Sequence, residues 1–302
     1  MRQSRPNEGL ARLCALFGVT RQAFYEAALH ESRTNISHMI VLTLVSEFRD
    51  DITVLGTRKL LFMLTPELEK HGIKLGRDQL FDLLRFHGLL IRKRKRMVKT
   101  TDSHHWLKKY PNLIKGMLLS AADQLWVSDI TYIRTLDGFS YLSLITDAYS
   151  RKIMGYALCE TLEAIGPTEA LVMAIKQRQA ISAFILIHHS DRGVQYCSSE
   201  YVDILAKANI AISMTQSGSP YDNALAERVN GTIKNDFSPN IVYPHHKEAK
   251  KAIAKIIQVY NQKRPHASVD YLTPDEAHLQ QGSLKKRWKP YYKPNKQMKV
   301  KE

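Results

Sequence analysis

Three acidic residues stand where they could bind a cation. Glu227 lies in S-G-S-P-Y-D-N-A-L-A-E-R-V-N-G-T-I-K, where turn-forming residues precede apolar residues at four-residue steps, so we expect it near the start of a helix. Asn230 and Lys234 follow on the same face of that helix. Asp129 and Asp191 each come where an apolar run of strand length is interrupted or ends. An acid, an amide and a cation on one helix face suit a polyanion held beside a metal.

The apolar pattern also predicts the elements that position these acids. Three strand-like runs separated by turn residues predict an antiparallel meander over residues 124–133, 139–146 and 152–158. A helix beginning at Pro167 leads to a strand over 184–188. Because a long crossover helix allows parallel pairing, that strand can pair with the Asp129 strand and bring Asp129 and Asp191 side by side.

The remaining elements complete a recognisable order. After the strand over 184–188, the pattern predicts a helix over 199–208, a strand over 210–214 and the Glu227 helix over 224–233. Three strands in a meander followed by helix, strand, helix, strand and helix is the order of the ribonuclease-H-like fold. We therefore expect an α/β core with a mixed five-stranded sheet and flanking helices.

Composition narrows the class of protein. The 302 residues carry a formal charge of +15, which favours a polyanionic partner such as double-stranded DNA, although a basic enzyme unrelated to DNA remains an alternative. The three cysteines are scattered, which indicates a reducing compartment without disulfides. His104 and His105 have no cysteine pair beside them, so a structural zinc site is not expected. With no run of eighteen apolar residues and no signal-peptide pattern, we expect a cytoplasmic protein without membrane attachment.

The chain ahead of the core is helical and basic. Two short helices over 10–17 and 20–29 form a helix-turn-helix candidate, or simply a packed pair, and a further helix is expected over 36–48. Thr65-Pro66 should kink or restart the next helical region. A second helix-turn-helix candidate ends in a helix over 77–87, and three of its residues could reach a DNA groove: Arg77, Gln79 and Arg85.

A run of five cations follows this helical region and is interpreted as a connector that contacts phosphates or, alternatively, as a solvated charge run. Its members are Arg92, Lys93, Arg94, Lys95 and Arg96. We expect residues 1–98 to form an all-α, helix-turn-helix-like DNA-binding region, 99–120 a linker, 121–281 the catalytic core and 282–302 a basic tail. The tail interleaves cations with aromatic residues, which suits nucleic acid or a disordered end equally well.

Four blocks of this sequence, in order, resemble a known family. W-V-S-D-I-T-Y, H-S-D-R-G-V-Q-Y, S-P-Y-D-N-A-L-A-E and Y-N-Q-K-R-P-H are similar to the insertion-sequence transposases with a retroviral-integrase-type catalytic core, in particular the second-frame product of the insertion-sequence-three family. The resemblance runs from the region of Leu13 to about Ala277 and implies DNA cleavage and strand transfer. Residue by residue, it implies that Asp129, Asp191 and Glu227 are catalytic and hold two Mg²⁺ or Mn²⁺ ions.

The expected DNA contacts come from basic and amide groups near those acids. We expect Lys234, Asn230 and Arg192 to contact DNA near the reactive phosphate, together with the five-cation run. Arg264, in Y-N-Q-K-R-P-H, is a candidate either for DNA contact or for bracing the core, and Gln195 and Tyr196 could also contact DNA. We expect a homo-oligomer on DNA. Two alternatives stay open: an integrase-like nuclease that does not join DNA, and an inert DNA-binding protein derived from a transposase.

Overall fold

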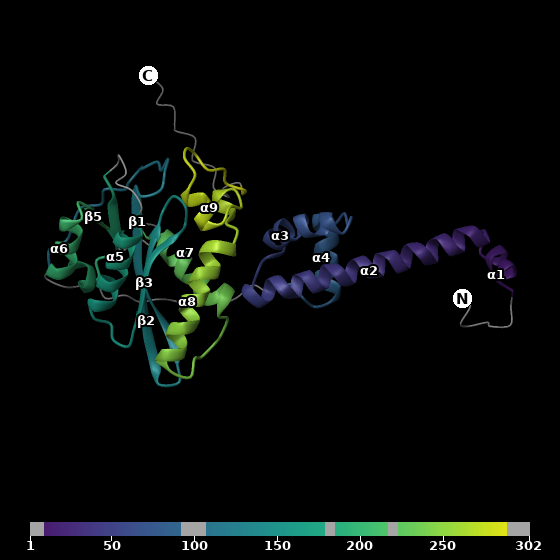
Figure 1. Ribbon diagram of the computed structural model, residues 1–302, viewed down its shortest axis with the longest axis horizontal. Coiled ribbons are helices and arrows are strands. Elements are labelled where there is room, and N and C mark those ends of the chain that lie inside the picture. Colours follow the sequence, from purple (N-terminus) through teal and green to yellow (C-terminus); the bar gives the residue numbers. More distant parts are fainter. Residues whose placement is uncertain (1–8, 92–106, 179–184, 217–222, 289–302) are drawn as a thin grey trace, which may run out of the picture. The chain divides into compact units, whose positions relative to one another are not determined.

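The computed structural model describes residues 9–91, 107–178, 185–216 and 223–288 (Figure 1). Contacts divide the chain into two units, one formed by residues 1–50 and 56–90 and the other by residues 51–55 and 91–302. The five cations from Arg92 to Arg96 therefore lie outside the described residues. In the described part of the chain, no helix combines the length and the apolar character needed to cross a membrane.

One mixed sheet organises the second unit. Its strands are β1 (Leu125–Thr135), β2 (Gly138–Asp147), β3 (Ile153–Cys159), β4 (Ile187–Ser190) and β5 (Ala211–Met214). They lie in the order β3-β2-β1-β4-β5, with β2 antiparallel to both β1 and β3 and β4 parallel to both β1 and β5. This is the strand order of the ribonuclease-H-like fold, and it confirms the predicted fold class.

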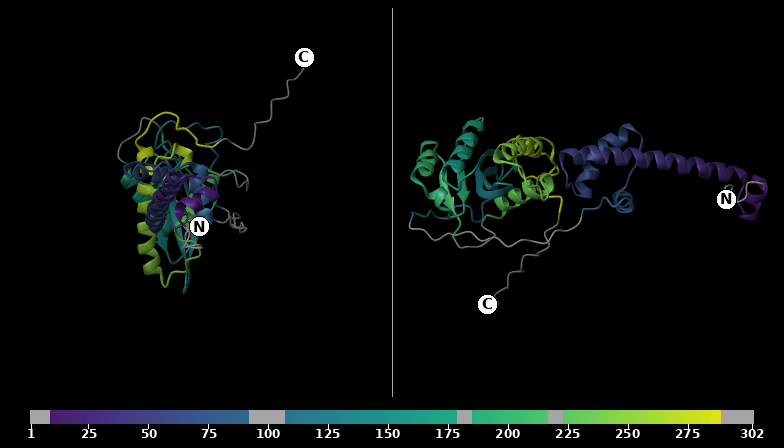
Figure 2. Two further views of the ribbon diagram at one scale, coloured as in Figure 1. Left: turned by 90° about the vertical axis from the view of Figure 1, so that its right-hand side faces the viewer. Right: turned by 90° about the horizontal axis from the view of Figure 1, so that it is seen from below.

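Helices cover both faces of this sheet. The main helices of the unit are α5 (Ile165–Gln177), α6 (Ser199–Lys207), α7 (Ala224–Thr232), α8 (His246–Lys263) and α9 (Pro274–His278). Within this unit α5 and α6 lie on one side of the sheet and α7 and α8 on the other (Figure 1), and the view from below shows the same layers (Figure 2). Three short elements complete the unit: the 3₁₀ turns η1 (Val194–Cys197) and η3 (Ala267–Val269), and the π-helical turn η2 (Ile233–Phe237).

The main core lies between the sheet and α5 and α6. Trp126, Ile145 and Met154 from three strands pack there with Leu171 of α5 and Leu205 of α6. Helix α5 approaches β3 closely because Gly155 has no side chain. A β-carbon at that position would lie 2.0 Å from the carbonyl oxygen of Ala170, closer than atoms can approach.

A smaller apolar cluster lies on the opposite face. Leu125, Val127 and Ala148 pack there with Ala226 of α7 and with partly buried residues of the segment that precedes β1. That segment belongs to the stretch predicted as a linker, residues 99–120, of which residues 107–120 are described. Two backbone contacts fix it to the sheet: the amide of Leu113 donates to Ser213 Oγ at 2.9 Å, and the amide of Met214 donates to the carbonyl of Pro111 at 3.2 Å.

The first unit is helical, with α1 (Leu10–Leu16), α2 (Arg21–Asp51), α3 (Thr57–Lys70) and α4 (Arg77–Phe86). The prediction of separate helices over 20–29 and 36–48 is wrong, because α2 is continuous for 31 residues. No glycine or proline interrupts that stretch, and polarity alone does not end a helix. Helix α3 continues through Pro66, whereas α4 begins at the predicted residue.

A short segment between α2 and α3 belongs to the second unit. Ile52 and Leu55 are fully buried. The amide of Val54 donates to the carbonyl of Asp236 at 2.8 Å, and Asp51 pairs with Lys263 at 2.6 Å. Part of the region predicted to bind DNA, residues 1–98, is therefore built into the unit that carries the sheet.

Candidate active site

Asp129 lies on the central strand β1 and is buried. Residues 125 to 129 of that strand are all buried, because both faces of the sheet are covered at this level. Its carboxylate accepts a hydrogen bond from the side-chain amide of Asn230 on α7, with Nδ2 2.8 Å from Oδ2. Asp129, the acid predicted to interrupt an apolar strand, thus has its carboxylate enclosed between the sheet and α7.

Asp191 follows β4 directly. In the parallel pairing of β1 with β4, Val127 lies beside His189, so the same register carried two residues further places Asp191 level with Asp129. Asp191 Oδ1 accepts a hydrogen bond from the amide of Gly193 at 3.0 Å, which shapes a tight turn after the strand. The expectation that these two acids stand on neighbouring strands agrees with this pairing.

Arg192 braces this turn. Its Nε donates to the carbonyl of Thr215 at 2.6 Å, and its Nη2 donates to the carbonyl of Gln216. These carbonyls follow β5, so the guanidinium joins the ends of β4 and β5. These contacts give Arg192 a structural role in holding the Asp191 turn, and its expected DNA contact stays a prediction.

Glu227 is exposed in the first turn of α7. The helix is held on β1 by two amides: Asn230 binds Asp129, and Asn223 Nδ2 donates to the carbonyl of Ser128 at 3.0 Å. Asn223 stands at the N-cap of α7, but its side chain makes no capping hydrogen bond. Glu227 thus projects from a helix that is fixed to the Asp129 strand by one residue before Glu227 and one residue after it.

Lys234 lies just after α7, in the π turn η2. Its Nζ lies 3.3 Å from Thr131 Oγ1 and 4.2 Å from the ring centroid of Tyr132. Thr131 is two residues beyond Asp129 on β1, so Lys234 is held roughly 7 Å along the strand from the buried acid. This position is consistent with the expected phosphate contact.

Among the described residues, no three acidic, histidine or cysteine side chains are grouped closely enough to hold a metal ion. The donors available nonetheless fit a hard divalent cation, since Asp129, Asp191 and Glu227 offer carboxylate oxygens. A further buried acceptor, Oδ1 of Asn230, has no hydrogen-bond partner among the described residues. A buried acceptor of this kind is expected to gain a donor, for example a water molecule carried by a bound ion.

Arg264 is buried and acts as a brace in this structure. Its guanidinium pairs with Asp236 of η2 and donates to His266 Nε2 at 3.0 Å. The neighbouring Asn261 bonds both the amide and the carbonyl of Ile153 on β3, at 2.9 and 3.0 Å. Of the two alternatives for the Y-N-Q-K-R-P-H block, bracing is the one that these contacts support.

Tyr196, which was expected as a possible DNA contact, is buried instead. Its Oη lies 3.0 Å from Ser128 Oγ, on the opposite face of β1 from Asp129. Burial, followed by the nearby charge of Asp191, raises the pKa of the phenol. Next to it, burial lowers the pKa of His188 to about 3, and this neutral imidazole bonds Tyr201 Oη at 2.9 Å. Sequence reasoning missed this network, because its members come from four separate elements: β1, β4, η1 and α6.

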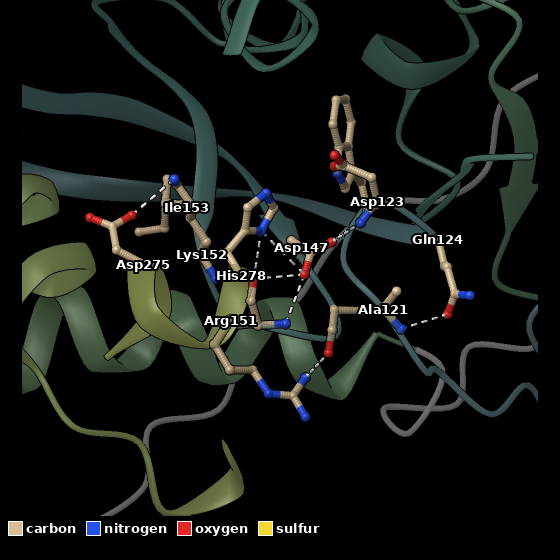
Figure 3. A network of polar contacts seen from close by, with 12 residues as sticks. Ala121, Asp123, Gln124, Asp147, Arg151, Lys152, Ile153, Asp275 and His278 are labelled. Atoms are coloured by element: carbon tan, nitrogen blue, oxygen red, sulfur yellow. Dashed lines mark hydrogen bonds and ion pairs between the residues drawn. The ribbon is translucent and has the colours of Figure 1, made fainter. Parts of the chain in front are cut away.

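Asp147, a further acid at the end of a strand, has a structural role. Figure 3 shows its carboxylate between Asp123 and His278. It accepts hydrogen bonds from the amides of Asp123 and Ser150, at 2.9 and 2.7 Å, and lies 4.0 Å from His278 of α9. Burial raises the pKa of this carboxyl. The network joins α9 and the start of β1 to the end of β2.

Known proteins match this chain over most of its length. An integrase core domain family matches residues 120–220, and a second integrase core domain family matches residues 208–274. An insertion element IS600 protein of Shigella sonnei is 34% identical over 87% of this chain and 96% of its own length. A putative transposase for the element IS986/IS6110 of Mycobacterium tuberculosis is 34% identical over 70% of this chain and 76% of its own length.

Solved structures include one of a viral integrase. The catalytic core of the HTLV-2 integrase, in complex with magnesium, aligns with 52% of this chain and 97% of its own, at 20% identity and a TM-score of 0.41. The strand order and the two integrase core matches define a polynucleotidyl transferase of the ribonuclease-H-like class. Given its relatives, the chain belongs to the insertion-sequence transposases with an integrase core, the DDE transposases, and the predicted resemblance is confirmed.

Proposed function

We propose that this transposase cleaves the ends of its insertion sequence and joins them to target DNA through Asp129, Asp191 and Glu227, which hold two Mg²⁺ or Mn²⁺ ions. The observation that carries the assignment is the placement of three motif acids around one strand. Asp129 lies on β1, Asp191 follows its parallel neighbour β4, and Glu227 lies on the helix fixed to β1. These elements come from distant parts of the sequence, and both β4 and α7 pack against β1.

The chemistry of the acids explains why a metal is expected. Carboxylates brought together in a folded core repel one another, and a divalent ion removes that cost. Two such ions, when bound, activate the attacking oxygen on one side of a phosphate and stabilise the leaving oxygen on the other. The protein's part is to hold the carboxylates in fixed positions and to hold the DNA beside them. Lys234, whose side chain contacts Thr131 of the Asp129 strand, would bind a phosphate next to the reacting one.

The substrate is double-stranded DNA, both the element ends and the target. The charge of +15 supports this, since neutralising phosphates supplies most of the affinity for DNA. We place recognition of the ends in α4, where Arg77 and Arg85 are exposed. Gln79, also predicted to reach the groove, instead bonds the amide of Gly76 at 2.7 Å. Because both ends must be processed together, a homo-oligomer in the bacterial cytoplasm is the proposed working form.

The decisive experiment incubates the protein with Mg²⁺ and a labelled duplex of the element end, and scores nicked and joined products. Both products should form, and both should vanish without a divalent ion. Nicking without joining would favour the nuclease alternative. Binding with neither product, under conditions in which a related transposase is active, would favour an inert DNA-binding protein.

A further inference from the structure

Two buried asparagines of the Glu227 helix bind the Asp129 strand at adjacent residues. Asn223 donates to the carbonyl of Ser128 at 3.0 Å, and Asn230 donates to the carboxylate of Asp129 at 2.8 Å. They are seven residues apart, close to two helical turns, so both lie on one face of α7 with Glu227 between them. The helix is thereby fixed against β1 both along its axis and in rotation.

The direction of both hydrogen bonds follows from chemistry. A backbone carbonyl and an ionised carboxylate are acceptors only, so each asparagine must present its NH₂ group to β1. Each side-chain carbonyl oxygen therefore points away from that contact. Both oxygens, Oδ1 of Asn223 and Oδ1 of Asn230, are buried without a hydrogen-bond partner among the described residues.

This arrangement is costly for folding alone. A buried acceptor without a partner destabilises the folded protein. Asn223 also stands at the N-cap of α7 yet makes no capping hydrogen bond, so the helix lacks the stabilisation that such a cap provides. A residue chosen for stability would cap the helix or be apolar. Both amides instead support the strand that carries Asp129.

We propose that Asn223 and Asn230 are positioning residues of the catalytic centre. Asn230 binds one oxygen of Asp129 and so fixes the plane of the carboxylate, and Asn223 holds the start of α7 so that Glu227 faces the same site. Neither amide needs to touch DNA, which reassigns Asn230 from the DNA contacts expected of it. The inference depends on the proposed function, because positioning matters only if Asp129 and Glu227 share an ion.

Partners that orient a metal ligand typically change metal affinity by about 10–100-fold when they are removed. The measurement is Mn²⁺ binding to the full-length protein without DNA, followed by electron paramagnetic resonance, together with thermal unfolding of each variant. Asn230→Leu keeps the volume of the side chain and removes its donor, so we expect Mn²⁺ affinity to fall by about 10–100-fold. Asn223→Leu should lower it in the same direction.

Asn261 supplies a matched control, because it also fixes a helix to a strand of this sheet by its side-chain amide, away from the acids. Asn261→Leu should lower the melting temperature and leave the Mn²⁺ affinity of the folded protein unchanged. Should Asn230→Leu not fold, Asn230→Ser shortens the side chain while keeping it polar, and the same loss of affinity is expected.

The Asp129→Asn variant distinguishes failure of the positioning role from failure of the metal assignment. If Asp129→Asn loses Mn²⁺ affinity while the folded Asn230 variants keep it, the positioning role is wrong and the metal site stands. If Asp129→Asn binds Mn²⁺ as the unaltered protein does, the metal assignment itself is wrong and the positioning role falls with it. A loss in the Asn230 and Asp129 variants but not in Asn261→Leu supports both.

Discussion

The ammonium group of Lys234 lies 4.2 Å from the ring centroid of Tyr132, over the aromatic face. A cation held over an aromatic ring keeps its charge and loses part of its freedom to move, so it is pre-organised to bind an anion. The contact places a fixed positive charge beside β1 and near Asp129.

Lys234→Ala should therefore weaken binding of the element end and lower the slope of log affinity against log salt by about one counterion. The slope is measured by fluorescence anisotropy at several salt concentrations. Lys251→Ala, an exposed lysine of α8, is the control and should change the slope less. An equal change in both variants would show that Lys234 contributes only general charge.

Asp129→Asn, Asp191→Asn and Glu227→Gln should each abolish nicking and joining while leaving DNA binding largely intact. Removing one ligand disturbs the whole metal site, so the losses should not add in double variants. Single-turnover assays on a labelled element end provide the measurement. Near-normal strand transfer by any one variant would remove that residue from the catalytic set.

Recognition by α4 can be tested with two exposed ion pairs of the same spacing. Arg85 pairs with Asp82 on α4, and Lys70 pairs with Glu67 on α3, each three residues apart. Arg85→Ala should reduce the preference for the terminal repeat over random duplex, whereas Lys70→Ala should not. Competition binding at two salt concentrations measures the preference. Full-length protein is required, because a fragment ending at residue 98 would expose Ile52 and Leu55, which are buried in the second unit.

The buried imidazole of His188 predicts a dependence of stability on pH. Its pKa is lowered from 6.5 to about 3, mainly by burial, so the unfolded chain binds a proton that the folded chain does not between those values. Stability should fall as pH drops below 6.5, with a slope approaching about 1.4 kcal/mol per pH unit from this residue. Denaturant unfolding between pH 4 and pH 7 should show a smaller slope in His188→Gln.

His245 provides a contrast of opposite sign. It is exposed, and its hydrogen bond to Asp137 raises its pKa. Its contribution to stability is therefore present at low pH and lost as pH rises through the folded pKa. His245→Gln should leave the loss of stability at low pH in place. If His188→Gln behaves like His245→Gln, the His188 imidazole does not control the acid side of the profile.

Gly155→Ala should destabilise the core, since the added methyl group would overlap the backbone of α5 at Ala170. Overpacking of this kind costs about 1–3 kcal/mol or more. Gly231→Ala is the control, because the nearest atom to its β-carbon would be Asn235 Nδ2 at 3.7 Å, and helical alanine is favoured over glycine. Equal melting temperatures for the two variants would contradict the close approach of α5 to β3.

Much of the sheet could be predicted from the sequence because its signals are local. Apolar runs bounded by turn residues gave β1, β2 and β3 within a few residues, and the long crossover explained why β4 lies beside β1. The acids were found because Asp129 and Asp191 interrupt or follow such runs. Helix α2 was divided in error, because polar residues in a long exposed helix look like a loop.

The roles of individual polar residues could not be predicted, because they depend on distant partners. Nothing around Arg264 indicates that it pairs with Asp236, and nothing around Tyr196 indicates that it lies beneath Ser128. Asn223 shows the same limit, since its position in the sequence favours a helix cap and the fold uses it on β1 instead. Tertiary contacts decided each case.

Lys234 and Asp236 lie in the same π-helical turn, η2. The side chain of Lys234 contacts β1, and that of Asp236 pairs with Arg264. A π turn holds about one residue more than an α turn, and losing that residue would rotate all that follows by about 100°. Both contacts would then be lost together. Length changes between Asn223 and Phe237 should therefore be absent when homologous chains are aligned, even where the amino acids themselves differ.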